Sequence, residues 1–252
     1  MVEILKADLH LHTAEDRSES IEHNAYRLLD EAHSQGFDVI SITNHDMFTF
    51  NRKLCEYAGK LGILLLPGVE LTVEGRHVLV IGELSGIRQV KRLKDLYKLK
   101  REQTLLIAPH PFFPASRGLG KSLFAYLDLF DVLEYSHCYT RLINYNRLAV
   151  RVAEKEGLPM ASFSDSHKLW QIGRSYSLLL GDRTHEGVLS ALRSGAVQMV
   201  TRPLGPLALI RTIQWIVPGL VGKLLDNTLK RGSQKHTVPE FTETIMDSRN
   251  AG

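Results

Sequence analysis

The chain has 252 residues, 44% of them hydrophobic and 23% charged, with a formal net charge of +3 at pH 7. This length supports one large core, and the small positive charge allows an anionic substrate without requiring nucleic acid. Its two cysteines, Cys55 and Cys138, form no CxxC pair, so neither a disulfide framework nor a thiolate zinc site is indicated. The first motif follows Met1 closely and leaves no room for a signal peptide, so we expect a cytoplasmic protein.

Residues 1 to about 200 alternate apolar runs with helical periodicity. A helix over 21–32 has one apolar face and stops at Gly36, before a buried strand over 37–43. This order of helix, glycine and strand is typical of β/α units, in which the functional loop follows the strand. Two more such units follow: a helix over 54–61 before a strand over 63–66, and a helix over 148–153 before a strand over 160–163.

Two segments depart from this alternation. Residues 71–73 and 77–81 are apolar and flank Glu74-Gly75, which predicts a β-hairpin. Residues 87–101 predict a basic helix with one apolar stripe. Its charged face is either a solvated surface or a flank that binds anions.

After Pro203 the chain changes character. Residues 204–225 are broadly apolar but contain Arg211, and a membrane-spanning helix needs about 20 apolar residues without a central charge, so we expect no transmembrane segment. The segment could instead pack on the domain, lie on a membrane surface or bind a partner. We therefore divide the chain into a domain over 1–203, an apolar or amphipathic helical segment over 204–231 and a disordered tail over 232–252.

Histidines and carboxylates stand at the apparent ends of the strands. Imidazole and carboxylate groups are the ligands of zinc, manganese and iron sites, and α/β barrels hold their active sites at the carboxyl ends of strands. His10 and His12 alternate on one strand, so both rings point to the same side and can share an ion. Burying so many rings without partners is unfavourable, which favours a metal site. The motifs are Asp8-Leu9-His10-Leu11-His12, Asn44-His45-Asp46, Gly68-Val69-Glu70, Pro109-His110-Pro111, Ser136-His137 and Asp165-Ser166-His167.

In order, spacing and strand context, these motifs resemble the PHP (polymerase and histidinol phosphatase) family of metal-dependent phosphoesterases, over about residues 4–200. The resemblance implies a distorted (β/α)7 TIM-like barrel. It also implies two or three divalent ions, of manganese, zinc or iron, at the C-terminal face of the strands. The implied reaction is hydrolysis of a phosphate ester by a metal-activated bridging water.

The resemblance also assigns the ligands. A third ion would take an acidic residue from the loop after His12, where the family's usual aspartate is replaced by Arg17. Asp16 is the best substitute, with Glu15 behind it. The first ion would be held by His10, His12, Glu70 and Asp165, the second by Glu70, His110 and His137, and the third by His45, His167 and Asp16.

A phosphate also needs a cationic partner, and arginine is its natural bidentate one. We favour Arg174, because it closely follows the motif of Asp165, and keep Arg17 and Arg117 as alternatives. The expected catalytic residues are Glu70, Asp165 and Arg174.

The remaining histidines receive no role. His23 and His33 are expected to be exposed on the first helix, and His77 starts a strand of the hairpin. Cys138 is expected to point away from His137, as neighbours on a strand do.

Two alternative functions stay open. An amidohydrolase would use similar motifs but bridge its metals with a modified lysine, where this chain presents Glu70. A non-catalytic PHP-like scaffold, docking a membrane or partner through residues 204–225, would have lost ligands that this chain keeps. The expected substrate is a small phosphorylated metabolite, a nucleotide or a short oligonucleotide. A long nucleic acid is less favoured, because the sequence shows no array of aromatic and basic residues on which its bases could stack.

Overall fold

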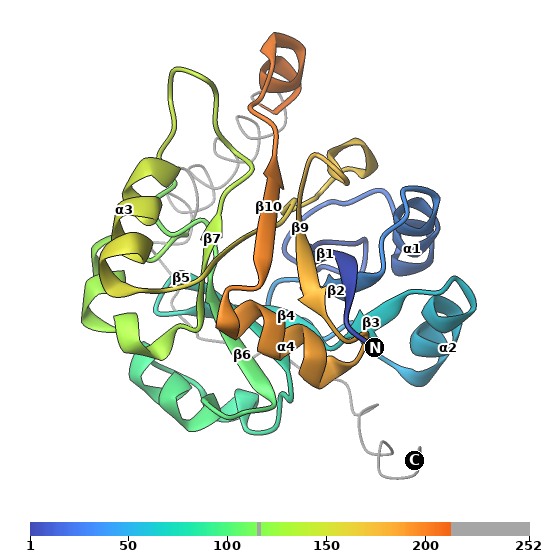
Figure 1. Ribbon diagram of the computed structural model, residues 1–252, viewed down its shortest axis with the longest axis horizontal. Coiled ribbons are helices and arrows are strands. Elements are labelled where there is room, and N and C mark those ends of the chain that lie inside the picture. Colours follow the sequence, from blue (N-terminus) through green and yellow to red (C-terminus); the bar gives the residue numbers. More distant parts are fainter. Residues whose placement is uncertain (115–116, 213–252) are drawn as a thin grey trace, which may run out of the picture.

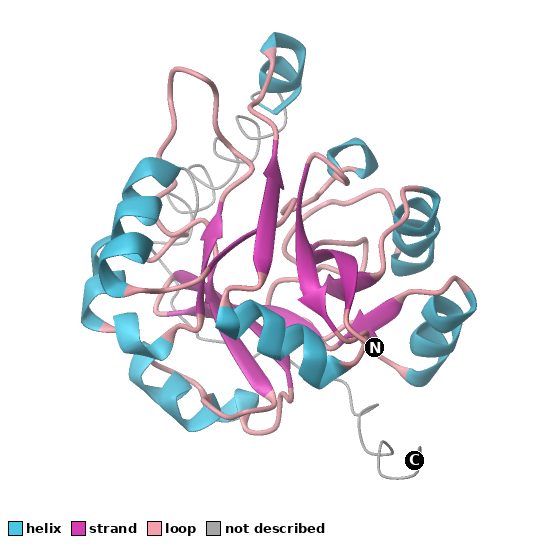
Figure 2. Ribbon diagram, viewed as in Figure 1, coloured by secondary structure: helices cyan, strands magenta, loops and turns pink. Residues whose placement is uncertain are grey.

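The computed structural model describes residues 1–114 and 117–212 and shows a mixed α/β fold. Helices lie around the strands (Figure 1, Figure 2). The strands are β1 (Glu3–Leu11), β2 (Val39–Ile42), β3 (Leu64–Leu66), β4 (Gly68–Val73), β5 (Arg76–Gly82), β6 (Thr104–Ala108), β7 (Val132–Tyr135), β8 (Met160–Ser162), β9 (Ser175–Gly181) and β10 (Val197–Thr201). The α-helices are α1 (Ala25–Ser34), α2 (Arg52–Lys60), α3 (Asn146–Glu156) and α4 (His185–Ser194), and the longer 3-10 helices are η2 (Leu93–Leu99) and η3 (Gly120–Ala125).

The helices predicted in the three β/α units form, and capping side chains set the starts of the first two. Asn24 accepts a hydrogen bond from the backbone of Arg27, so α1 begins at Ala25 rather than at Ile21. Asn51 caps α2 in the same way. The apolar face of α1 is buried, as its periodicity predicts.

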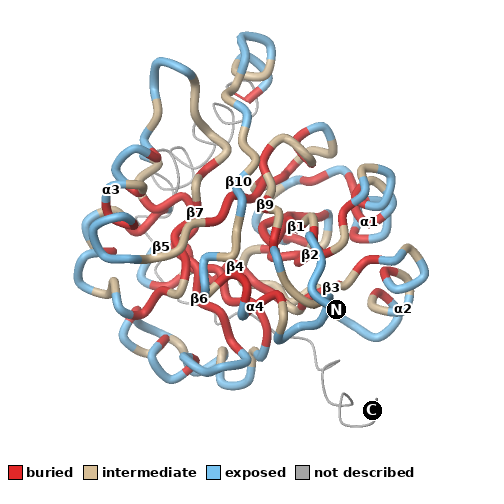
Figure 3. Tube along the Cα trace, in the orientation of Figure 1, coloured by how far each residue is buried: buried red, intermediate tan, exposed pale blue. Residues whose placement is uncertain are grey.

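The strands form two five-stranded sheets, in the orders β10-β9-β1-β2-β3 and β4-β5-β6-β7-β8. β1, β2 and β3 are parallel to one another, and so are β6, β7 and β8. β4 and β5 form the predicted antiparallel hairpin. One apolar cluster takes side chains from both sheets, among them Leu9, Leu79 and Ile107, so the core lies between the sheets (Figure 3).

The two sheets meet where β3 leads into β4 and near several strand ends. Only Pro67 separates β3 from β4, so the chain passes directly from one sheet to the other. Single bridges, Leu11 with Ser166 and His45 with Glu70, also link the sheets near the strand ends. Strand pairings among the described residues do not close into one ring, so the mixed α/β class is confirmed and the (β/α)7 barrel is not.

Two peripheral segments were predicted to be helical, and only one of the two predictions can be compared with the structure over its full length. Residues 87–101 contain short 3-10 helices, Ile87–Gln89 and η2, rather than one continuous helix. A helix begins at residue 206 and is described as far as 212, so most of the predicted segment over 204–231 and the whole tail over 232–252 lie outside the described residues. Within the described ranges, no helix is long and apolar enough to cross a membrane.

Candidate metal centre

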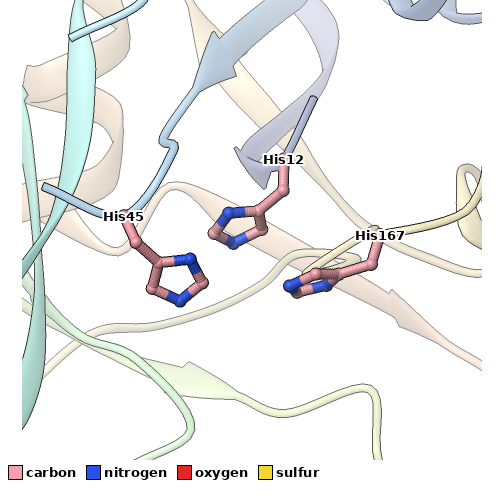
Figure 4. A group of neighbouring side chains, drawn as sticks. All are labelled: His12, His45 and His167. Atoms are coloured by element: carbon pink, nitrogen blue, oxygen red, sulfur yellow. The ribbon is translucent and has the colours of Figure 1, made fainter. Parts of the chain in front are cut away.

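The predicted ligands gather where the strand ends meet. β1 carries His10 and leads into His12, β4 carries Glu70, and the other ligands follow β2, β6, β7 and β8. Figure 4 shows the rings of His12, His45 and His167 reaching toward one another from separate segments. The rings of His12 and His167 stack with their centroids 4.3 Å apart, although 155 positions separate the two residues (167 − 12).

Glu70 lies at the middle of this cluster and is buried. Its Oε2 is 3.3 Å from Nε2 of His10, 3.3 Å from Nε2 of His12 and 3.1 Å from Nε2 of His45. Its Oε1 is 3.2 Å from Nε2 of His110. Burial opposes ionisation of Glu70, but the surrounding imidazoles outweigh it and hold the pKa of the carboxyl well below its usual value. Both oxygens therefore face nitrogen donors, as a bridging carboxylate would.

Asp165 approaches the same two imidazoles. Its Oδ1 lies 3.4 Å from Nε2 of His10 and 3.4 Å from Nε2 of His12. Its backbone has a φ of +46°, and His110 has a φ of +31°. Non-glycine residues rarely adopt such left-handed conformations, which cluster at functional sites because the surroundings hold them there.

A second layer of carboxylates lies behind the imidazoles. Asp16 Oδ2 is 3.2 Å from Nδ1 of His12 and 2.8 Å from Nδ1 of His45. Glu134 Oε1 is 2.9 Å from Nδ1 of His10. The Nδ1 atoms thus face carboxylates while the Nε2 atoms face the centre, which is how outer carboxylates orient the imidazoles of metal sites.

These contacts help to compare Asp16 with Glu19 as the acidic ligand of the predicted third ion. Asp16 contacts His12 and His45 on their outer nitrogens, as an orienting residue does. Glu19 Oε2 instead lies 3.3 Å from Nε2 of His167. Burial lowers the pKa of His167 to about 3, so this ring is neutral and able to coordinate. The assignment of Asp16 as a metal ligand stays a prediction.

The donor atoms fit divalent cations. Among the described residues, four groups of three side chains have potential ligand atoms that lie within 4.8 Å of one another. The buried Nε2 atoms of His10 and His12 lie 3.3–3.4 Å from oxygens of Glu70 and Asp165 without forming a hydrogen bond to them, an unfavourable state that a coordinated cation would relieve. The groups are His12, His45 and His167; His10, His110 and Asp165; His10, His12 and Glu70; and His45, Glu70 and His77.

The predicted ligand His137 belongs to none of these groups. Its Nε2 is 3.0 Å from Sγ of Cys138, and its Nδ1 is buried without a hydrogen-bond partner. The expectation that Cys138 points away from His137 is therefore wrong. It assumed strand alternation, but β7 ends at Tyr135, before both residues. The role of His137 as a ligand stays a prediction.

Sequence reasoning missed three buried residues around the centre. A role for Glu134 in the centre could have been predicted, because a carboxylate is rarely buried within an apolar strand unless it has a partner. His77 places its Nδ1 2.8 Å from Oε1 of Glu70. His23 was expected to be exposed, but it is buried before α1, and its Nε2 lies 3.1 Å from the carbonyl oxygen of the predicted ligand His12. The expected exposure of His33 is confirmed.

None of the candidate phosphate-binding arginines takes part in the contacts described above among the histidines and carboxylates. Arg174 lies over the ring of Trp170, 5.9 Å from its centroid, and Arg211 lies 6.0 Å from the same centroid. Both arginines line a cavity of about 290 Å³ with residues 205–208. Arg17 and Arg117 are exposed. A phosphate-binding role remains a prediction for Arg174, Arg17 and Arg117.

Comparison with known proteins finds similarity to the PHP family in both sequence and fold. A model of the PHP-associated family matches residues 144–197. A two-domain protein of Bacteroides vulgatus, said to contain a predicted PHP-like metal-dependent phosphoesterase, has a TM-score of 0.65 and 24% identity, with coverage of 80% of this chain and 66% of that chain. The resemblance to the PHP family is confirmed.

Two other relatives extend this picture. The lesion-specific endonuclease PfuEndoQ of Pyrococcus furiosus has a TM-score of 0.59 and 18% identity, covering 81% of this chain and 60% of that chain. An uncharacterized protein of Methanocaldococcus jannaschii is 28% identical over 169 residues, which are 63% of this chain and 96% of the relative. At these identities the structural matches show a PHP-like fold and leave the reaction to the site itself.

Proposed function

We propose that this protein is a metal-dependent phosphoesterase whose ions are held by the imidazole and carboxylate cluster. One observation carries the proposal: buried Glu70 has both oxygens within 3.3 Å of imidazole nitrogens from separate strand ends. A buried carboxylate surrounded in this way is what a bridge between cations requires. When bound, the ions would lower the pKa of a water nucleophile and hold the phosphoryl oxygens.

The chain's own residues would keep this arrangement rigid. Glu70 and Asp165 would provide carboxylate ligands, while Asp16 and Glu134 orient the rings of His12, His45 and His10 from behind. Outer carboxylates of this kind fix the imidazole tautomer and raise its basicity. Arg174 would bind the phosphate from the loop that follows Asp165, provided that it leaves the face of Trp170.

The amidohydrolase alternative is less well supported by the geometry. Such an enzyme would bridge its metals with a modified lysine, but here the central position is filled by Glu70, which contacts His10, His12, His45 and His110. The scaffold alternative predicts lost ligands, whereas the ligand atoms of this chain converge.

For the substrate, we propose a small phosphorylated metabolite, a nucleotide or a short oligonucleotide. One solved relative is endonuclease Q in complex with a 27-mer duplex that carries an abasic lesion at the active site. DNA with such a lesion therefore belongs among the substrates to test. The cytoplasmic location, the identity of the metals and the domain boundary at residue 203 stay predictions.

A phosphoester panel tests the proposal. Purified protein loaded with manganese or zinc would be assayed on p-nitrophenyl phosphate, its diester, nucleoside bisphosphates, short oligonucleotides and an abasic duplex. We expect hydrolysis of at least one class, lost in Glu70→Gln and kept in Glu102→Gln, whose carboxylate is exposed. Hydrolysis of amides but of no phosphoester would favour the amidohydrolase. The absence of both metal binding and hydrolysis would favour the scaffold.

A further inference from the structure

A cavity outside the ligand cluster lies between two segments that follow strands. Its volume is about 290 Å³, and it is lined by Trp170 and Arg174 and by residues 205–208 with Arg211. Trp170 belongs to the short 3-10 helix Leu169–Gln171, after β8, and Arg211 to the helix that begins at residue 206, after β10. Sites for whole small molecules usually measure about 300–1,000 Å³, so this cavity suits one group of a larger ligand.

The cavity lies at the same edge of the sheet as the metal centre. β9 is antiparallel to β1, and β10 is antiparallel to β9, so β10 runs in the direction of β1. The chain therefore leaves β10 at the edge where β1 leads into His12, and the helix from residue 206 lies beyond the end of β10 (Figure 1). On the other side of the cavity, Trp170 follows the predicted ligand His167 by three positions, so their Cα atoms are at most about 11 Å apart.

Hydrogen bonds connect both sides of the cavity to loops that carry predicted ligands. Oε1 of Gln171 accepts hydrogen bonds from the backbone N–H groups of His167 and Lys168, both at 2.8 Å. The backbone N–H of Leu204 donates to the carbonyl oxygen of Tyr139 at 2.7 Å, in the loop that follows β7. A group bound in the cavity would therefore lie at a defined position relative to the metal centre.

The two guanidinium groups of the cavity have no anionic partner in the described part of the chain. Arg174 and Arg211 lie 5.9 Å and 6.0 Å from the ring centroid of Trp170, at the distance of a cation–π contact. Neither forms an ion pair with a carboxylate of residues 1–114 or 117–212, whereas Arg193, for example, pairs with Asp131. Two positive charges thus line one cavity without a counter-ion, and a bound anion would offset their repulsion.

We propose that this cavity binds a second phosphate group of the substrate, one that is not hydrolysed, between Arg174 and Arg211. A guanidinium binds phosphate oxygens through two parallel hydrogen bonds, and the ring of Trp170 would hold both groups in place before the substrate arrives. Contact of Arg174 with the reacting phosphate would require it to leave Trp170, whereas binding in the cavity would not. The inference rests on the proposed function and narrows its substrates to molecules with at least two phosphates, a nucleoside bisphosphate or an oligonucleotide.

The first test is the steady-state kinetics of metal-loaded Arg211→Ala. We expect its KM for a nucleoside bisphosphate or an oligonucleotide to rise about ten-fold, because a charged hydrogen bond to the substrate is lost, while kcat stays unchanged. Its kinetics on p-nitrophenyl phosphate, which carries one phosphate, should match those of the wild type. Arg202→Ala is the matched control, because Arg202 is exposed in the same segment and does not line the cavity.

The choice of substrate decides how these kinetics are interpreted. An unchanged KM for every substrate with two phosphates would overturn the proposal. An equal rise in KM for p-nitrophenyl phosphate would also overturn it, because Arg211 would then act at the reacting phosphate. A rise for the nucleoside bisphosphate alone would identify a terminal phosphate as the bound group, and a rise for the oligonucleotide alone would identify a phosphodiester of the strand.

Tryptophan fluorescence tests binding without hydrolysis. The chain has two tryptophans, so Trp215→Phe leaves Trp170 as the only one. This chain, carrying also Glu70→Gln to prevent hydrolysis, would be titrated with the nucleoside bisphosphate and with the oligonucleotide. We expect at least one of them to change the emission until it saturates, and Arg211→Ala to raise its dissociation constant about ten-fold. No change in emission with either, or equal affinity in Arg211→Ala, would overturn the proposal.

These measurements also distinguish this proposal from the proposed function. Binding at Trp170 that depends on Arg211, in a protein whose wild type hydrolyses no phosphoester, would contradict the function alone. Hydrolysis of phosphoesters with KM and fluorescence unaffected by Arg211→Ala would contradict this inference alone. Circular dichroism of each variant would verify that the fold is retained.

Discussion

At the scale of single residues, Glu134 contacts two predicted ligands, one with each of its carboxylate oxygens. Its Oε1 lies 2.9 Å from Nδ1 of His10, and its Oε2 accepts a hydrogen bond from the backbone N–H of His110 at 2.7 Å. His110 has a left-handed backbone, which needs such external support. Glu134 therefore orients one ligand by its side chain and the other by its backbone.

We predict that Glu134→Gln weakens metal binding about 10- to 100-fold, the range found for outer residues of metal sites. The amide keeps the shape of the carboxylate but removes its charge and places an N–H beside His110 or His10. Competition with a chelator would measure the change, with Glu102→Gln as the exposed control. Wild-type affinity in Glu134→Gln would mean that the ring of His10 is oriented by other contacts.

Asp16 and Glu19 can be separated in the same way. Because Asp16 contacts the outer nitrogens of both His12 and His45, Asp16→Asn should weaken the binding of more than one ion, by about 10- to 100-fold. Glu19→Gln should affect only the ion next to His167. Elemental analysis at increasing chelator concentration would show which ions leave first. If Glu19→Gln instead weakened the binding of more than one ion and Asp16→Asn that of only one, Glu19 would be the residue that orients several ligands.

Arg174 provides a prediction about the substrate. If it binds the phosphate, Arg174→Ala should lower kcat/KM by roughly 10- to 100-fold, since a charged hydrogen bond contributes about 1.5–3 kcal/mol. Metal content should not change, because a guanidinium carries only donors and cannot coordinate a cation. Arg174→Lys should restore activity only in part. Unchanged kinetics would point to Arg17 or Arg117 instead.

At the scale of elements, the hairpin of β4 and β5 positions the centre, and Gly68 lets it approach β2. A Cβ built on Gly68 would lie 2.2 Å from Oγ of Ser41 and 2.8 Å from Cδ1 of Ile81. Only glycine therefore allows β4 to pass this close to β2, and this approach brings Glu70 next to His45.

We predict that Gly68→Ala destabilises the protein by about 1–3 kcal/mol, as overpacking of a core does. Gly59→Ala is the matched control, because a Cβ on Gly59 meets nothing within 4 Å and alanine favours the helix α2 by up to about 1 kcal/mol. Denaturant unfolding would measure both. Equal stability of the two variants would mean that β2 and β4 can separate without loss.

Sequence signals predicted the elements whose determinants are local. The glycine stops, the strands and the histidines after them are all read within about ten residues, so His10, His12, His45 and Asp165 could be placed at or just after strand ends. Glu70 was also expected at a strand end, but it lies inside β4 because the strand continues into the hairpin. His77 required the register of the hairpin: counting back from its turn pairs Thr72 with His77 and would have placed this ring beside Glu70.

Two failures show where local signals mislead. Leu93, Leu96 and Leu99 recur at every third residue and are buried, a spacing that suits a 3-10 helix better than the α-helix predicted for 87–101. His23 was placed on the first helix because its periodicity begins at Ile21, whereas the cap at Asn24 starts α1 after it. The pairing between the two sheets depends on contacts far apart in sequence, which no local pattern reports.

At the scale of the whole molecule, the centre joins the two sheets that enclose the core. Its predicted ligands come from both sheets and from the loops that follow their strands, so a bound cation would hold these sheets together. A ligand that binds only the folded state stabilises it, by about 2.7 kcal/mol at a concentration of 100 Kd.

We therefore predict that metal loading raises the melting temperature. For a protein of this size, about 1 kcal/mol shifts the midpoint by roughly 2–4 °C, so saturation should raise it by several degrees over a chelator-treated sample. Differential scanning calorimetry with and without manganese or zinc would measure this shift. In Glu70→Ala the metal-dependent increase should be largely absent. An equal increase in that variant would mean that metals stabilise the protein elsewhere.

The measurement that tests the central claim most directly is the number of ions bound per chain in the wild type and in Glu70→Ala. If Glu70 bridges the centre, the wild type loaded with manganese or zinc should hold at least about two divalent ions per chain. Glu70→Ala should lose two of them together, while keeping the circular dichroism spectrum of the folded protein. Less than one ion per chain in the wild type, or an unchanged count in Glu70→Ala, would contradict the account.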